Sequence, residues 1–174
     1  MSLITDIQEG LFERLEGFLR WELFDRVLDV TIDKGVPLEY AEKCAEALCS
    51  LSDEMINDIY EAAKRYCLFF IDLCGDAWDY DDYDMTIRVT EDTPAEMMRS
   101  EIRPHVFIVD TPKDERIGFH IECGCSWEPE HGLEITILDG KLVYLGGFED
   151  RGAWDKFDPN DEWNFANDLP KTSL

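Results

Sequence analysis

The amino-acid sequence predicts a single α+β domain in which N-terminal helices pack on a C-terminal antiparallel sheet, a meander of about 4–5 strands. Apolar residues recur at helical spacing in three segments before residue 75. They alternate with polar residues and glycines from Ile117, and Asp139-Gly140 then separates two apolar segments as a hairpin turn would. The chain therefore divides into a helical part (1–75), a mainly β part (76–147) and an acidic aromatic tail (148–174).

Three helices are expected in the first part. The first follows a capping box of Thr5 and Gln8, and its apolar positions are Ile7, Leu11, Leu15, Phe18, Leu19, Leu23, Val27 and Leu28. Gly35 and Pro37 end this segment, and a second helix covers residues 38–48. The third helix is capped by Ser52 and ends at Gly75, and its apolar face is Ile56, Ile59, Tyr60, Ala63, Cys67, Phe70 and Cys74.

Strands are expected in the second part. Residues 85–90 alternate as a half-buried strand does, Thr93-Pro94 begins a short helix, and residues 106–109 form an apolar strand. The Asp139-Gly140 turn should place Ile137 opposite Leu142 and Ile135 opposite Tyr144. We expect the tail, which carries Phe148, Trp154, Phe157, Trp163 and Phe165, to lie back on the domain in irregular or short helical structure.

Alternation in residues 117–127 sorts the side chains between the two faces of a strand. Cys123, Cys125 and Trp127 should face the core, whereas His120 should point to the opposite face, part of which a helix should cover. This argues against a zinc site made by His120, Cys123, Cys125 and His131, because one strand cannot present both faces to one ion without a bulge. We predict no metal and no cofactor.

The formal net charge is −24. Domains of this size are soluble at a net charge of roughly 2–8 in magnitude, so solubility alone does not require such an excess. The field repels nucleic acid and anionic membranes and attracts basic proteins or cations. A merely acidic, halophile-like surface is the simpler explanation. Six cysteines without a signal peptide or an apolar segment of membrane-spanning length indicate a cytoplasmic protein with reduced, mostly buried thiols.

Segment 127–132, WEPEHG, holds a possible acid–base pair in Glu130 and His131. Adjacent side chains usually point apart, and no nucleophile is near. A turn explains the segment better: Pro129 fixes it, Gly132 supplies the unusual backbone angle, and Glu130 or His131 bonds main-chain groups. Catalytic triads, phosphate-binding loops and zinc-protease motifs are absent from the sequence, so enzyme activity has no positive support.

An acidic aromatic segment, DAWDYDDYD at residues 76–84, is the predicted partner-binding site. Aromatic rings anchor in pockets of a partner, while carboxylates pair with lysine and arginine. The predicted binding residues are Trp78, Asp79, Tyr80, Asp81, Asp82, Tyr83 and Asp84. The competing interpretation is that the rings belong to the core beside a solvated charged face. A calcium loop of the EF-hand type is disfavoured because its glycine and closing glutamate are missing.

Two segments, the helix ending in AAKRYCLFFIDLCG and the stretch 117–147, carry a resemblance. The second resembles an uncharacterised bacterial family, a domain of unknown function marked by Cys125, Trp127, Glu130, His131, Gly132, Leu133, Asp139, Gly140, Val143 and Gly146. The resemblance implies a small cytosolic bacterial protein without an assigned reaction. Some similar domains sit in loci that resemble toxin–immunity systems.

The sequence therefore leads to a functional hypothesis: a non-enzymatic, immunity-like module that masks a basic protein such as a nuclease toxin. One alternative is a metal-binding or hydrolytic enzyme that uses His120, His131, Glu128 and Glu130. Another is a structural or regulatory module whose acidity is incidental.

Overall fold

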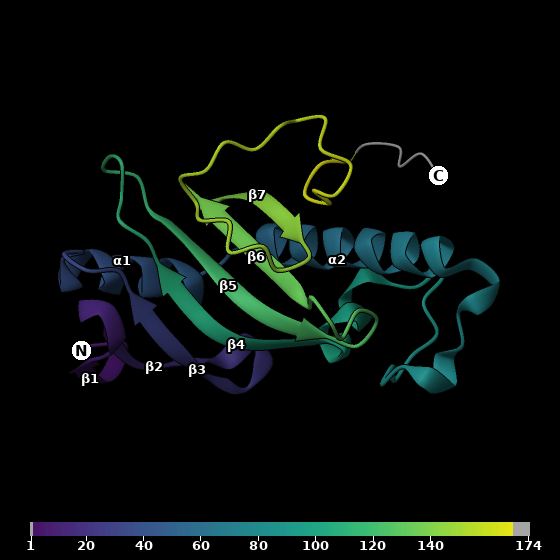
Figure 1. The fold of residues 1–174 in the computed structure, drawn as a ribbon, viewed down its shortest axis with the longest axis horizontal. Helices are drawn as coiled ribbons and strands as arrows, with labels where there is room; N and C mark the ends of the chain where they lie inside the picture. The colour runs from purple at the N-terminus through teal and green to yellow at the C-terminus, as the bar shows by residue number, and fades with distance from the viewer. Residues whose placement is uncertain (1, 169–174) are drawn as a thin grey trace.

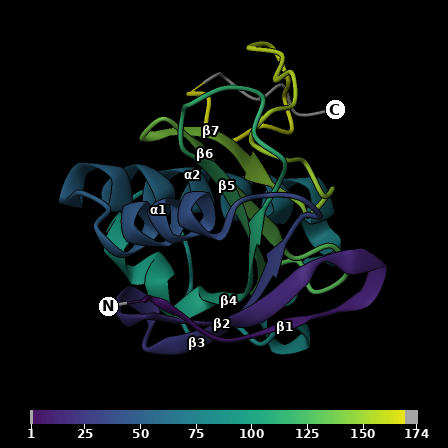
Figure 2. The same cartoon turned by 90° about the vertical axis from the view of Figure 1, so that its left-hand side faces the viewer.

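Seven strands form one mixed sheet, and two α-helices lie on one side of it (Figures 1 and 2). The computed structural model describes residues 2–168. The helices are α1 (Leu38–Cys49) and α2 (Asp53–Cys74). The strands are β1 (Ile4–Glu9), β2 (Leu15–Trp21), β3 (Arg26–Ile32), β4 (Ile102–Val109), β5 (Gly118–Cys125), β6 (Leu133–Leu138) and β7 (Lys141–Gly146). Within these residues, no helix has the length and apolarity needed to cross a membrane.

The predicted meander of about 4–5 antiparallel strands is wrong, because the described sheet has seven strands and is mixed. Its strands are neighbours in chain order, and β3 runs parallel to β4 with Asp29 opposite Val106 and Ile32 opposite Val109. The connection between these two strands contains α1 and α2, which return the chain to the same end of the sheet. The helices are therefore inserted into the sheet sequence and do not precede it.

The first predicted helix, from Thr5 to the end at Gly35 and Pro37, is also wrong, because this part of the chain forms β2, β3 and all but the first residue of β1. Leu19 and Trp21 of β2 are buried at alternate positions, as are the β3 residues Leu28, Val30 and Ile32. The apparent helical spacing arose because these core residues were counted together with exposed ones. Leu11, for example, lies at the β1–β2 connection and is 75% exposed.

Both helices of the crossover confirm their predictions. Helix α1 covers the expected segment, and α2 begins after Ser52, whose hydroxyl accepts the Met55 backbone N–H at 3.2 Å. Such a cap stabilises a helix by about 1 kcal/mol. Gly75 ends α2 with φ +53°, a backbone angle that glycine adopts without a Cβ clash. Ile59, Ala63 and Cys67 of the predicted apolar face are buried.

Residues 75–101 connect α2 to β4, and here the predicted strand 85–90 is wrong. The segment is irregular, and the carboxylate of the buried Glu101 holds it by accepting hydrogen bonds from the backbone N–H and the hydroxyl of Thr86. A short helix does follow Pro94, but it is the 3-10 helix Ala95–Glu101. Thr93 does not cap it and instead accepts the Thr90 N–H at 2.8 Å.

The strands after residue 102 follow the prediction more closely. Cys123, Cys125 and Trp127 are buried in the core, and Cys44 and Cys67 make four buried cysteines of the six. The Asp139-Gly140 turn has φ values of +51° and +68° and places Ile137 opposite Leu142 as expected. A bulge after Thr136 then shifts the register, so that Ile135 lies opposite Leu145 and not opposite Tyr144.

The described part of the tail, residues 148–168, lies back on the domain in irregular turns, as predicted. It covers the edge of β7: Phe165 N–H donates to the Leu145 carbonyl at 2.7 Å, and the Asn164 side chain bonds Leu145 N–H and Val143 O. It also covers the second face of β5 and β6 with Ala153, so the helix expected on that face is wrong. The hydrogen bonds of Phe165 and Asn164 to β7 close a sheet edge that would otherwise be open.

Candidate functional site

The acidic aromatic segment 76–84 packs on the C-terminal end of α2. Trp78 stacks on Tyr83 with ring centroids 4.1 Å apart, and it meets Tyr80 edge-on at 5.4 Å. Phe70 of α2 meets the Trp78 ring at 6.1 Å. The three rings of the segment are half-buried against one another, whereas the carboxylates of Asp79, Asp81, Asp82 and Asp84 are exposed. The aromatic groups therefore build the segment, and the acidic groups are the part that a partner can reach.

A pocket of about 420 Å³ lies beside this segment. Phe70 belongs to both, because it contacts Trp78 and Tyr83 and also lines the pocket. Helix α2 supplies one wall, the turn after β5 a second, and β7 with the chain that follows it the rest. The lining residues are Tyr66, Phe70, Leu73, Glu128, His131, Tyr144, Gly147, Phe148, Glu149 and Trp163. Aromatic walls with two carboxylates are suited to a cation that carries apolar groups.

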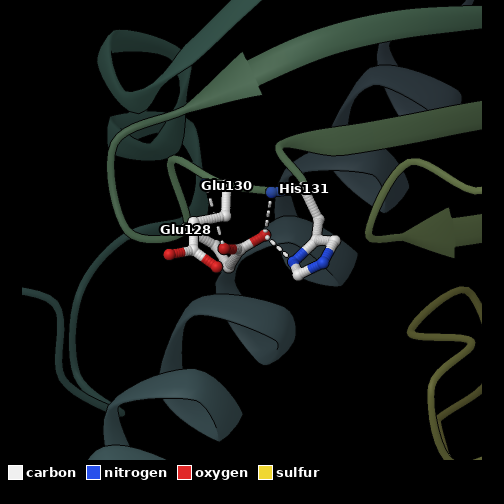
Figure 3. Close-up of side chains that lie close together, drawn as sticks. All are labelled: Glu128, Glu130 and His131. Atoms are coloured by element: carbon white, nitrogen blue, oxygen red, sulfur yellow. Dashed lines mark hydrogen bonds and ion pairs between the residues drawn. The ribbon is translucent and has the colours of Figure 1, made fainter.

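The turn that forms one wall is organised by Glu128, whose side chain is almost fully buried. Figure 3 shows how Glu128, Glu130 and His131 lie close together in this turn. Its carboxylate accepts the backbone N–H of Glu130 at 3.1 Å and of His131 at 2.7 Å, and it lies 3.2 Å from the His131 imidazole Nδ1. Gly132 has φ +66°, and a Cβ there would lie 2.5 Å from the Cys123 carbonyl oxygen. The turn is confirmed, but Glu128 bonds the main chain, and not Glu130 or His131 as expected.

The side chains that the sequence offered as metal ligands do not all lie at one site. His120 is buried, whereas the His131 side chain is 70% exposed. Among residues 2–168, the group of three or more such side chains whose ligand atoms come together is Glu128, Glu130 and His131, all within 4.8 Å. Both oxygens of Glu128 already accept backbone N–H groups. The geometry of this group is thus explained by the turn itself.

His120 belongs to a buried charged cluster on β5 and β6. Its Nδ1 lies 2.6 Å from the fully buried Glu134 carboxylate, and its Nε2 lies 3.4 Å from Asp110. Burial alone lowers the pKa of His120, but the close carboxylates of Asp110 and Glu134 outweigh it and raise the pKa to about 9. Glu134 also accepts the N–H groups of Glu149 and Arg151. The cluster therefore fastens the start of the tail to the sheet.

The comparison with family models matched residues 8–152 to a family described as "Domain of unknown function (DUF6985)". The chain belongs to this family. The match extends from β1 through β7 and includes segment 76–84 and the turn at Glu128. It stops before Trp163, so of the residues that line the pocket Trp163 comes from outside the family domain. Neither the comparison with curated proteins nor that with solved structures found a match.

The residues of the resemblance have distinct structural roles in this member of DUF6985. Trp127 is fully buried and meets Tyr66 of α2 edge-on at 5.6 Å. Gly132 allows the tight turn, while Glu130 and His131 are exposed. The part of the motif from Trp127 to Gly132 thus shapes the turn beside the pocket.

Sequence reasoning missed the pocket, although α2 carried a signal for it. Tyr66, Phe70 and Leu73 follow helical spacing and form a second apolar stripe beside the core stripe of Ile59, Ala63 and Cys67. A helix with so wide an apolar face must contact more than one neighbour. No such signal exists for Phe148, Glu149 and Trp163, because the irregular path of the tail brings them to the helix.

Proposed function

We propose that this DUF6985 protein is a non-enzymatic module that binds a basic protein partner on the surface formed by segment 76–84 and the adjacent aromatic pocket. The observation that carries the proposal is the pocket, in which Phe70, Phe148 and Trp163 accompany two carboxylates at the border of four exposed aspartates. The net charge of −24 supports it, because a strongly acidic surface accelerates association with a basic partner.

In this proposal a lysine or arginine side chain of the partner enters the pocket. Its charged group stacks on an aromatic face and pairs with Glu149, which is exposed. Asp79, Asp81 and Asp82 then pair with further basic groups around the rim. The pocket holds the basic side chain of the partner, and the aspartates around it increase the rate of association and the selectivity of binding.

The kind of partner that fits best is a bacterial nuclease toxin, which makes the protein immunity-like. A nuclease presents a cationic cleft that binds phosphates, and a row of exposed aspartates can occupy such a cleft in place of nucleic acid. The resemblance to domains in toxin–immunity loci supports this partner class.

The test begins with capture of partners by the full chain at low salt and at about 150 mM salt, where distant charges are screened. The identified basic partner is then titrated against Asp81→Lys/Asp82→Lys. A matched control, Glu9→Lys/Asp29→Lys, makes the same charge change on exposed positions of β1 and β3. We expect the first variant to weaken binding at least about tenfold and the control less than about twofold.

A second arm tests the pocket itself. Glu149→Gln removes one pocket carboxylate, and Glu9→Gln is its control. We expect a loss of affinity with the first and none with the second. If no basic partner binds at either salt concentration, or if both double variants weaken binding equally, the proposal fails.

Metal binding is the second candidate function, and the observation that favours it is the approach of Glu128, Glu130 and His131 within 4.8 Å. Elemental analysis after dialysis against zinc discriminates the two. Stoichiometric zinc that is lost in His131→Ala would support a metal site, whereas zinc content equal in both proteins would argue against it.

A further inference from the structure

A second pocket, of about 550 Å³, gathers cationic side chains in this strongly acidic protein. The whole sequence has 16 lysines and arginines against 40 aspartates and glutamates. Three of the 16, Arg26, Arg99 and Arg103, nevertheless line this one pocket. Segment 76–84 and the aromatic pocket do not explain this grouping, since they attract the opposite charge.

The parallel pairing of β3 and β4 places these arginines together. Arg26 begins β3 and Arg103 is the second residue of β4, and each lies three residues before the aligned pair Asp29 and Val106. Arg99 comes from the 3-10 helix that leads into β4. Parallel strands begin at the same edge of a sheet, so the pocket is a product of the mixed topology.

The hydrogen bonds of the three guanidinium groups leave donors available. Arg99 donates Nε–H to the Leu23 carbonyl at 2.7 Å, which fixes the side chain. Its two terminal nitrogens make no hydrogen bond or ion pair within residues 2–168. Arg26 is exposed and has no hydrogen bond or ion pair within those residues. Arg103 bonds Ser126 Oγ at 2.9 Å and the Cys125 carbonyl at 3.3 Å, so it is held in place.

The chemistry of the lining defines the ligand. Planar guanidinium groups bind phosphate oxygens in a bidentate manner, and three of them balance an anion of two or more charges. Phe24 and Met97 add apolar surface, and Met97 is 43% exposed. Glu96 lies in the same lining and can accept a hydrogen bond from a hydroxyl or amino group. A long polyanion is disfavoured, because the surrounding field of the protein repels each additional phosphate.

We infer that this arginine pocket binds a small organic phosphate, a molecule with one or two phosphoryl groups and a body that bears apolar surface and hydrogen-bond donors. Nucleoside mono- and diphosphates are ligands of this class. The phosphoryl groups lie among Arg26, Arg99 and Arg103, and the body contacts Phe24 and Met97. The inference does not rest on the proposed protein binding, although Asp84 of segment 76–84 lies next to Arg103.

Asp84 gives the pocket an internal competitor. Its carboxylate lies 3.8 Å from Arg103 and is 95% exposed, so this ion pair is weak. A bound phosphate takes the place of Asp84 at Arg103. Removal of the Asp84 charge should therefore strengthen phosphate binding, an effect opposite to that of a folding defect.

Calorimetric titration of the full chain with ADP and with inorganic pyrophosphate, at fixed ionic strength and without magnesium, tests the proposal. ADP should bind more tightly than pyrophosphate because its body adds contacts. Arg26→Gln should weaken ADP binding roughly tenfold, since a hydrogen-bonded ion is lost. The control Arg20→Gln, the same substitution on β2 outside the pocket, should change it less than about twofold.

The competitor is tested with Asp84→Asn, which should tighten ADP binding several-fold, and with Asp81→Asn, which makes the same charge change away from Arg103 and should not. The proposal is overturned if neither ADP nor pyrophosphate binds at about 1 mM. It is overturned equally if Arg26→Gln and Arg20→Gln weaken binding alike. Equal affinity for ADP and pyrophosphate would overturn the claim that the pocket recognises an organic body. Tighter binding of a single-stranded oligonucleotide than of ADP would overturn the claim that the ligand is small.

Discussion

Stability above neutral pH should depend on one buried imidazole, that of His120. Folding raises the pKa of His120 from an unfolded value of about 6.5 to about 9, so the folded protein holds this proton more tightly than the unfolded chain does. The stabilisation is complete below about pH 6.5 and is lost as the pH rises through about 9. Each unit of difference between the folded and unfolded pKa corresponds to about 1.4 kcal/mol.

These values give a loss of about 2 kcal/mol in the free energy of unfolding between pH 6.5 and 8.5. The window must end there, because buried thiols add a loss of the same sign above their unfolded pKa of about 8.5. Burial raises the pKa of Cys44 and of Cys125 to about 12. The His120 imidazole thus accounts for the loss of stability up to about pH 8.5, and the buried thiols add to it at higher pH.

Urea unfolding followed by tryptophan fluorescence, at several pH values from 6.5 to 8.5, measures the loss. His120→Gln retains a donor to Glu134 but cannot titrate, so its stability should be lower at pH 6.5 and should change little with pH. The ring proton signals of His120 in NMR should titrate near pH 9. The reasoning is refuted if the free energy of unfolding of the wild-type protein changes by less than about 0.5 kcal/mol between pH 6.5 and 8.5, or if the His120 ring titrates near pH 6.5.

Three further predictions concern stability. Added salt between about 20 and 200 mM should raise the melting temperature, because it screens repulsion in a protein of net charge −24, and a fall would contradict this. Gly132→Ala should cost about 2 kcal/mol or more in urea unfolding, since its Cβ would meet the Cys123 carbonyl at 2.5 Å, whereas Gly140→Ala, also at positive φ but with open space, should cost less. Phe165→Ala should cost about 3–5 kcal/mol because the ring is buried against α2, and a loss below about 1 kcal/mol would mean that the tail is not docked.

The sequence predicted those elements whose signals are local. Ser52 and Gly75 marked the ends of α2, and the Asp139-Gly140 turn fixed the β6–β7 hairpin. The N-terminal strands failed because core and surface apolar residues are interleaved there. Leu28, Val30 and Ile32 alternate correctly, yet exposed Val27 and Leu11 complete an equally good helical pattern.

The candidate sites were harder to predict for a different physical reason. Alternation correctly placed Cys123 and Cys125 in the core, but it could not reveal that Glu134 lies beside His120 across a strand pair. The aromatic pocket requires the tail to reach Phe70, and the arginine pocket requires a parallel register between β3 and β4. Both depend on contacts between distant segments, which no periodicity in one segment encodes.

The parallel pairing of β3 with β4 also separates folding into two local steps and one long-range step. Strands β1–β3 and strands β4–β7 each join consecutive segments, so each set can form from contacts that are near in sequence. Their junction can form only after residues 33–101 have folded back across the sheet, which makes it the contact with the largest cost of chain closure. We expect this junction to set the folding rate: substitutions along it should slow folding, whereas those within either strand set should mainly speed unfolding.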